Sequence, residues 1–367
     1  MGHSTRSALY PLKFTLLPKE KVWGGQKLKG LLGGVSAGMG NIGEVWEVWE
    51  GLAVTNGPLR GKTLKTLVHE SPRGILGDSI PSEPEIIFPL LLKLIDAQDT
   101  LSVQVHPDDG YARAREKQPF GKTEMWYVLE AEPDARIVHG LNRPVDQAEL
   151  RHAIERGTLT ELLEFVPVAR GDIFLLKAGT IHALGKGIMV YELQQSSDLT
   201  YRLYDWGRRP SGGVARELHV DKSLEVARLE PIPDHKIRAV DLPETGYRRR
   251  LLCACSYFAV EQLISGSRIT QQLEGKFHIV TALEGTVSLR PTGGKSEELT
   301  LHPLESALVP AGFSQYQILP LEKRYTVMKA YIPNLQADIV SPLLVAGVPR
   351  SEVVQLGVDP ASISIDR

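Results

Sequence analysis

Two stretches of the chain repeat each other: Gly121-Lys122-Thr123-Glu124-Met125-Trp126-Tyr127-Val128-Leu129-Glu130 and Gly275-Lys276-Phe277-His278-Ile279-Val280-Thr281-Ala282-Leu283-Glu284. The segments that follow them also match in the same order, Leu175-Leu176-Lys177-Ala178-Gly179-Thr180-Ile181-His182 and Leu308-Val309-Pro310-Ala311-Gly312-Phe313-Ser314-Gln315. Short aliphatic and aromatic runs bounded by glycine or proline turns are typical of β-strands. The chain therefore contains an internal repeat of a strand-loop-strand unit.

This repeat predicts the fold class. Turn residues are frequent, with 34 glycines and 24 prolines in 367 residues, and short apolar runs lie between them. Two copies of such a unit favour two antiparallel double-sheet barrels of the jelly-roll or cupin type. We therefore expect a mainly β protein with two cupin-type antiparallel jelly-roll barrels and a short helical insertion in the first.

Helical patterns are few and would lie outside the barrels. The interval from Glu124 to His182 is longer than that from His278 to Gln315, and the excess fits an insertion at about 142–167. Apolar spacing predicts helices over 86–95, 145–156, 159–165 and 351–356. The charged, proline-containing stretch 231–250 predicts a boundary between a first domain, residues 1–240, and a second, degenerate domain, residues 241–367.

Composition excludes several classes of protein. A net charge of -2 and a pI near 6.6 argue against a nucleic-acid-binding or membrane-surface protein. The two cysteines, Cys253 and Cys255, are too few for a disulfide scaffold and lack a second metal-binding pair. Because neither the amino terminus nor the apolar run over 86–95 has the pattern of a leader or a membrane span, we expect a cytoplasmic protein whose partners are small molecules.

A short alternating strand over 101–108 carries Gln104 and His106 on one face. An amide oxygen beside an imidazole suits zinc or another first-row divalent ion, although a solvated strand face is the common alternative. The first repeat copy adds Glu124 and His182, which makes four candidate ligands from three strands. The second copy has His278 and Gln315 at the matching places but no preceding Gln-x-His pair, which indicates a barrel that keeps the fold without the complete metal site.

The chain resembles a known family, the type I phosphomannose isomerases of the short bacterial form, nearly from end to end. The residues that carry the resemblance are Val22-Trp23-Gly24-Gly25, Gly43-Glu44-Val45-Trp46-Glu47, Leu92-Lys93-Leu94-Ile95, Ser102-Val103-Gln104-Val105-His106-Pro107-Asp108, Gly121-Lys122-Thr123-Glu124-Met125-Trp126-Tyr127, Ala178-Gly179-Thr180-Ile181-His182-Ala183 and Gln195-Ser196-Ser197-Asp198-Leu199-Thr200-Tyr201-Arg202. The order and spacing of these pieces are more specific than any one of them.

The resemblance implies an activity and a metal site. Members interconvert mannose 6-phosphate and fructose 6-phosphate, and Gln104, His106, Glu124 and His182 fall on the family's zinc ligands. One Zn²⁺ per chain is therefore expected, in a site with room for water or a sugar oxygen. Arg202 falls on the family's essential arginine, and its permanent charge suits the stabilisation of an enediolate.

The resemblance also suggests which of the remaining site residues are catalytic and which contact the substrate. Glu192 is our leading candidate for the proton-transfer base, and Lys122 is a further catalytic candidate that would share a strand face with Glu124. We expect Lys93, Ser102 and Asp198 to contact the substrate, with Lys93 facing the phosphate because a lysine inside an apolar run must reach either solvent or an anion. Structural roles for Glu192 as a partner of Arg202, and for Asp198 as a turn-capping residue, are the alternatives.

Two other functions remain open from the residues alone. A cupin oxidase or dioxygenase with iron or manganese would normally use more histidines than His106 and His182. A non-catalytic sugar-binding or regulatory cupin would tolerate the loss of a ligand, yet all four candidates are present. The helical segment is shorter than in long family members, and the turn after Arg202 differs from theirs. The sequence leaves open the oligomeric state, monomer or homodimer, and the role of the second barrel.

Overall fold

The computed structural model describes residues 9–78, 86–208, 215–292 and 297–363. They form two compact units. The first-copy unit comprises Pro18–Trp46 and Leu90–Ile237 and contains the first copy of the repeat. The second-copy unit comprises the segment ending at Leu17, Glu47–Pro89 and the chain from Arg238 onward. This grouping places two early segments with the second copy, and the expected domains 1–240 and 241–367 stay a prediction.

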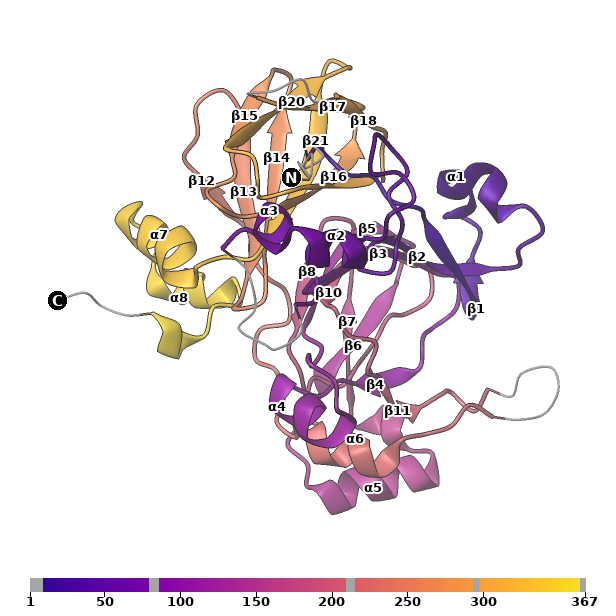
Figure 1. The fold of residues 1–367 in the computed structure, drawn as a ribbon. Coiled ribbons are helices and arrows are strands. Elements are labelled where there is room, and N and C mark those ends of the chain that lie inside the picture. Colours follow the sequence, from indigo (N-terminus) through magenta and orange to yellow (C-terminus); the bar gives the residue numbers. More distant parts are fainter. Residues whose placement is uncertain (1–8, 79–85, 209–214, 293–296, 364–367) are drawn as a thin grey trace. The chain divides into compact units, whose positions relative to one another are not determined.

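The first-copy unit contains two antiparallel sheets (Figure 1). One has six strands in the order β1-β2-β3-β10-β5-β8, and the other has five in the order β11-β4-β9-β6-β7. The strands are β1 (Leu17–Gly25), β2 (Ile42–Val48), β3 (Leu90–Ala97), β4 (Val103–Val105), β5 (Glu124–Ala131), β6 (Arg136–Leu141), β7 (Leu163–Pro167), β8 (Ile173–Leu176), β9 (His182–Ala183), β10 (Ile188–Gln195) and β11 (Tyr201–Tyr204).

The second-copy unit repeats this arrangement. Its six-stranded sheet has the order β12-β13-β14-β21-β16-β19, and a four-stranded sheet has the order β15-β20-β17-β18. The strands are β12 (Val240–Leu242), β13 (Arg248–Ala254), β14 (Ala259–Ser265), β15 (Ile269–Gln272), β16 (His278–Glu284), β17 (Val287–Pro291), β18 (Leu299–Leu301), β19 (Ser306–Val309), β20 (Gln315–Pro320) and β21 (Tyr325–Tyr331).

The two units confirm the predicted repeat and the mainly β, antiparallel fold class. Glu124 opens β5 and pairs with Leu176 of β8, while His278 opens β16 and pairs with Val309 of β19. These are the residues that the sequence comparison aligned. Each unit also has its own apolar core: one cluster around Leu203 and Ile181 and another around Trp126 lie in the first-copy unit, and a third around Tyr316 lies in the second-copy unit.

Helices are short and lie outside the sheets. They are α1 (Lys29–Leu32), α2 (Leu64–Glu70), α3 (Pro72–Leu76), α4 (Asp109–Tyr111), α5 (Gln147–Arg156), α6 (Val220–Val226), α7 (Ser341–Val345) and α8 (Arg350–Gln355), with single turns η1 (Gly33–Ser36), η2 (Ala112–Glu116), η3 (Leu159–Glu161), η4 (Leu335–Val340) and η5 (Pro360–Ser362). The helices predicted over 145–156 and 351–356 are confirmed by α5 and α8. The Asp146 carboxylate caps α5 by accepting a hydrogen bond from the Glu149 amide.

Two predicted helices are wrong. The run over 86–95 contributes β3, every residue of which is buried, so its continuous apolar pattern comes from a central strand covered on both faces. Periodicity cannot distinguish such a strand from a buried helix. The segment 159–165 forms only the turn η3 before β7 begins at Leu163, because its residues continue the five-stranded sheet beside β6.

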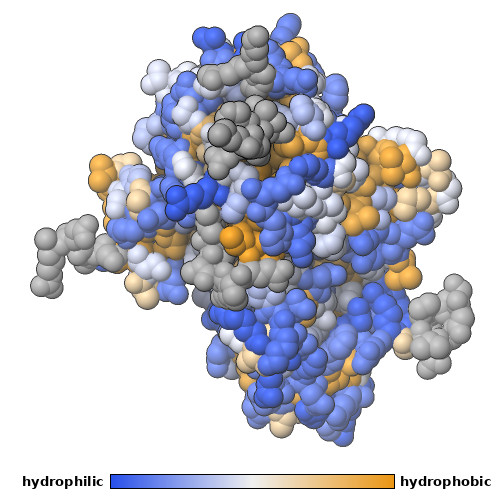
Figure 2. All heavy atoms as spheres, in the orientation of Figure 1, coloured by the Kyte–Doolittle hydropathy of each residue, from blue (hydrophilic) through white to orange (hydrophobic). Residues whose placement is uncertain are grey.

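The surface is largely polar on the face shown in Figure 2, where blue spheres predominate and orange ones are scattered. Among the described residues, the exposed large hydrophobic side chains are Val22, Val35, Leu218, Leu321 and Val345. Within that part of the chain, no helix is long and apolar enough to cross a membrane.

Candidate functional site

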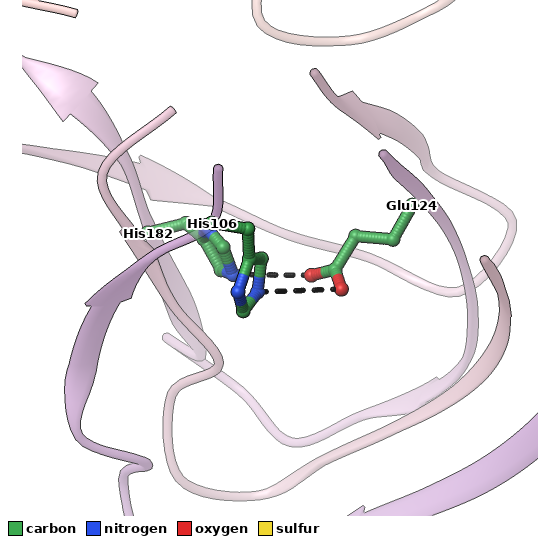
Figure 3. Close-up of side chains that lie close together, drawn as sticks. All are labelled: His106, Glu124 and His182. Atoms are coloured by element: carbon green, nitrogen blue, oxygen red, sulfur yellow. Dashed lines mark ion pairs between the residues drawn. The ribbon is translucent and has the colours of Figure 1, made fainter. Parts of the chain in front are cut away.

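Side chains from both sheets of the first-copy unit converge on one point (Figure 3). Glu124 comes from β5 in the six-stranded sheet, while His182 comes from β9 and His106 follows β4 in the five-stranded sheet. The candidate ligand atoms of these three residues all lie within 4.8 Å of one another. Antiparallel pairing of β4 with β9 brings them together, since it sets Gln104 directly opposite His182.

The two imidazoles face the carboxylate of Glu124. Nε2 of His182 lies 3.0 Å from one Glu124 oxygen, and Nε2 of His106 lies 3.5 Å from the other. The second ring nitrogen of each histidine is held by a backbone carbonyl: Nδ1 of His106 lies 2.8 Å from the Leu199 oxygen, and Nδ1 of His182 lies 2.8 Å from the Thr180 oxygen. If each Nδ1 carries the proton, both Nε2 atoms are free to bind a cation, as in metal sites whose histidines are oriented by carbonyl groups.

Gln104 lies at the same point. Its side-chain amide nitrogen is 3.3 Å from Nε2 of His182. The oxygen and nitrogen of a carboxamide exchange places by a flip about the last torsion, so the amide oxygen can take this position next to the three other ligands. The four residues predicted as ligands are therefore close neighbours.

The electrostatics of the cluster favour a bound cation. Burial by itself raises the pKa of Glu124, but the Lys122 ammonium and the two imidazoles hold that pKa well below its usual value. Burial, followed by the charge of Lys122, lowers the pKa of His106 well below the ordinary value, so this ring is neutral. A buried carboxylate beside imidazole nitrogens is a typical donor set for a divalent metal.

Glu124 also has unused acceptor capacity. Its side chain is fully buried, and neither oxygen accepts a hydrogen bond of suitable geometry from a described residue, although Nζ of Lys122 lies 2.7 Å away. Buried carboxylate oxygens left in this state are costly unless something binds them. With two imidazoles and one amide, these oxygens fit a four-ligand Zn²⁺ site.

Lys122 and Glu192 border the cluster. Nζ of Lys122 lies 3.0 Å from Nε2 of His106 as well as against Glu124. Glu192 lies on β10, two residues from Gln194, which pairs with Glu124 on β5. Burial and the neighbouring Glu124 charge raise the pKa of Glu192, against the opposing effect of Lys93.

Lys93 is placed against carboxylates rather than solvent. Its Nζ lies 2.8 Å from Oε1 of Glu192 and 3.7 Å from Oε2 of Glu44, and the residue is 5% exposed. Burial lowers its pKa, but these two carboxylates outweigh burial and keep the ammonium charged. The contact follows from the strand register, because Lys93 of β3 pairs with Glu192 of β10.

Sequence reasoning missed two residues that contact the Glu192–Lys93 pair. The indole Nε1 of Trp126 donates a hydrogen bond of 2.7 Å to Oε2 of Glu192, and Glu44 shares the Lys93 ammonium. Strand alternation could have found Trp126, because it lies two residues after Glu124 and so on the same face of β5. Glu44 belongs to one of the motifs quoted above, yet only the fold brings it to Lys93.

Arg202 and Ser102 lie on the other side of Gln104. Arg202 of β11 pairs with Gln104 of β4, and its Nε donates to Oγ of Ser102 at 3.2 Å while Nη1 donates to the Glu217 carbonyl at 2.8 Å. Asp198 is different: its side chain is exposed in the loop between β10 and β11, and its carbonyl accepts a bond of 3.5 Å from the Thr200 hydroxyl.

Known proteins resemble this chain over most of its length. Residues 12–135 match the model of the phosphomannose isomerase type I catalytic domain. Mannose-6-phosphate isomerase ManA of Bacillus subtilis (strain 168) is 40% identical over 284 residues, which is 75% of this chain and 86% of that protein. The crystal structure of a mannose 6-phosphate isomerase from Bacillus subtilis has a TM-score of 0.76 at 30% identity and covers 88% of this chain and 99% of its own. A zinc-bound holo mannose 6-phosphate isomerase shares the fold, with a TM-score of 0.66 at 17% identity over 87% of this chain and 99% of its own.

Proposed function

The chain belongs to the type I phosphomannose isomerase family, and from that premise we propose which of its residues carry out the reaction. It is a zinc-dependent isomerase that interconverts mannose 6-phosphate and fructose 6-phosphate. The observation that supports the residue assignment best is the convergence of His106, Glu124 and His182 on one buried point. The oxidase and binding-protein alternatives are not favoured by this family membership.

Gln104, His106, Glu124 and His182 would hold the single Zn²⁺. Bound there, the ion supplies Lewis-acid polarisation of the sugar's carbonyl and hydroxyl oxygens. Two neutral imidazoles, one neutral amide and one carboxylate leave about one net positive charge in the site. Because Gln104 adds no charge, the site stays more electrophilic than it would with a second carboxylate.

Glu192 is the proposed proton carrier between C2 and C1. It removes the proton from C2 of the aldose as the carbonyl oxygen at C1 gains electron density, and it returns a proton to C1 of the resulting enediolate. The proton of the C2 hydroxyl passes to the oxygen on C1, so C2 becomes the carbonyl carbon and C1 carries the hydroxyl, and no redox cofactor is needed. A buried carboxyl whose pKa is raised by burial and by Glu124 is suited to both halves of this exchange.

Four further residues act together with Glu192 in this proposal. Lys93 and Trp126 hold its two oxygens and so fix the direction in which it reaches the substrate. Arg202 stabilises the negative charge of the enediolate, and Lys122, poised between His106 and Glu124, orients or protonates a sugar oxygen. These donors are fixed before the charge develops, which is where electrostatic stabilisation is most effective.

The contacts to the rest of the substrate stay predictions. Ser102 is placed beside Arg202, and Asp198 is exposed in the following loop. Lys93 was expected to meet the phosphate, but its pairing with Glu192 and Glu44 favours the supporting role instead. A cytoplasmic location, and a monomeric or homodimeric state, also belong to the proposal.

Turnover tests the assignment. The zinc-loaded protein is incubated with mannose 6-phosphate and the formation of fructose 6-phosphate is followed, before and after chelation and in Arg202→Ala. We expect turnover that stops on chelation, returns with zinc, and falls at least a hundredfold in the variant. Exposed Arg113→Ala, on η2, is the matched control. Turnover that survives complete removal of the metal contradicts the metal assignment, and near-normal turnover of Arg202→Ala contradicts the role of this arginine.

A further inference from the structure

The second-copy unit contains a cavity of about 570 Å³ that the isomerase reaction does not use. Its size is within the range of about 300–1,000 Å³ that is usual for small-molecule sites. Strands β12, β13, β15, β16 and β21 contribute to the lining, and so do η4 and α7. Four polar lining side chains are at most 5% exposed: Gln271, His278, Lys329 and Tyr331.

This cavity occupies the place in its unit that the candidate metal site occupies in the other. His278 opens β16 as Glu124 opens β5, and Gln272 pairs with Gln315 as Gln104 pairs with His182. The positions are the same in the two sheets, but the donor set has changed. A barrel that had kept only a structural role would be expected to fill this position with apolar side chains.

The charge pair behind the cavity is reversed relative to the first copy. Glu192 of β10 pairs with Lys93 of β3, whereas Lys329 of β21 pairs with Glu261 of β14 in the same sheet positions. The carboxylate next to the first site is thus replaced by an ammonium group next to the second. Lys329 lines the cavity and Glu261 does not.

Cations and carboxylates are paired around the cavity. The carboxylate of Glu261 accepts two hydrogen bonds from Arg249, of 2.7 and 2.8 Å, and lies 2.8 Å from Nζ of Lys329. Nη1 of Arg249 also lies 2.9 Å from Oε1 of Glu244, a lining carboxylate, so Arg249 is paired with two acids, whereas Glu261 is the carboxylate next to the buried Lys329. Burial lowers the pKa of Lys329, and the charge of Arg249 adds to this effect although Glu261 opposes it.

The cavity also presents hydrogen-bond donors that lack acceptors. Nζ of Lys329 donates to Glu261 and, at 3.1 Å, to Oε1 of Gln271, so two of its three protons have partners among the described residues. Nδ1 of His278 lies 3.2 Å from the Tyr316 hydroxyl, and its Nε2 makes no hydrogen bond to any described residue. Buried donors of this kind are matched by a ligand rich in acceptor oxygens.

We propose that this cavity is a second ligand site, which binds a small organic oxyanion, a metabolite with a phosphate or carboxylate group. The anionic oxygens accept hydrogen bonds from the buried donors of Lys329 and His278. Lys276 lines the cavity as a further cation, paired at 3.1 Å with Asp338. The rings of Tyr247 and Tyr331 line the same cavity and offer surface to the carbon skeleton.

Calorimetric titration of the full-length, zinc-loaded protein tests the proposal with three probes: inorganic phosphate, succinate and the neutral sugar mannose. Ala346→Trp blocks the cavity, because Ala346 is an exposed lining residue on the C-terminal end of α7. The matched control is Val345→Trp, at the neighbouring position, which is 89% exposed and does not line the cavity. Lys276→Gln removes a lining charge without touching the buried Glu261 network.

At least one anion is expected to bind wild type and Val345→Trp equally. Its dissociation constant is expected to rise at least tenfold in Ala346→Trp and in Lys276→Gln. Whether phosphate or succinate binds identifies the anionic group. Isomerase turnover is expected to be unchanged in all three variants, which would show that they are folded. The proposal is overturned if neither anion distinguishes Ala346→Trp from Val345→Trp, or if mannose competes for the cavity as strongly as the anions do.

Discussion

Replacing Glu47 by glutamine is expected to remove a large pH dependence from the stability of the protein. Glu47, at the end of β2, is 2% exposed, and burial raises the pKa of its carboxyl to about 8 from the usual 4.5. Its Oε2 accepts a hydrogen bond from Oγ of Ser306, while Oε1 has no partner among the described residues. The nearby Glu305 adds to the rise in pKa, and Lys13 opposes it. In the folded protein this carboxyl is therefore neutral at pH 7.

The sign of the effect follows from proton binding. Between pH 4.5 and about 8 the folded state holds a proton on Glu47 that the unfolded state has released, so stability falls as the pH rises through this window. Each unit of pKa difference corresponds to about 1.4 kcal/mol, which makes the full effect about 5 kcal/mol. About 3 kcal/mol of it is expected between pH 6 and pH 9. Glutamine resembles the neutral carboxyl in shape and does not titrate.

Urea denaturation at a series of pH values measures this effect. The difference in free energy of unfolding between wild type and Glu47→Gln should change by about 3 kcal/mol from pH 6 to pH 9, with the variant gaining relative stability at high pH. Glu70→Gln, at an exposed position on α2, is the control and should follow wild type. A difference between wild type and Glu47→Gln that stays constant over this range would refute the buried, neutral state of Glu47.

Three further predictions concern the active site and the second-copy unit. Arg202→Lys should lower kcat by about a hundredfold while the zinc content stays at the wild-type level. The reason is that an ammonium group cannot reproduce the two directed contacts of the guanidinium. Steady-state kinetics and metal analysis measure both quantities. Trp126→Phe removes the indole hydrogen bond to Glu192 and should raise the pKa of that base. The acidic limb of the pH profile of kcat should therefore move to higher pH by about one unit. A limb that does not move would contradict the assignment of Glu192 as the base. Glu261→Gln leaves Arg249 and Lys329 without their shared carboxylate and should lower the free energy of unfolding by about 3–5 kcal/mol, measured by urea denaturation.

The repeat and the ligand set could be predicted from the sequence because both depend on local order along strands. Strand alternation places Gln104 and His106 on one face, and the matching of Glu124 with His278 fixed how the two copies align. The fold confirms that alignment in the pairings of β5 with β8 and of β16 with β19. Local patterns of this kind can be recognised without knowing which strands are neighbours in the sheet.

The partners of the buried charges depended on the tertiary structure. Lys93 lies within an apolar run that reads equally well as a helix, and only the pairing of β3 with β10 brings it to Glu192 instead of to solvent. The same pairing in the second-copy unit brings Lys329 to Glu261. The sequence by itself determined the repeated β fold and the four candidate metal ligands. The antiparallel register decided which charges compensate each other, because strands adjacent in a sheet can be far apart in the chain.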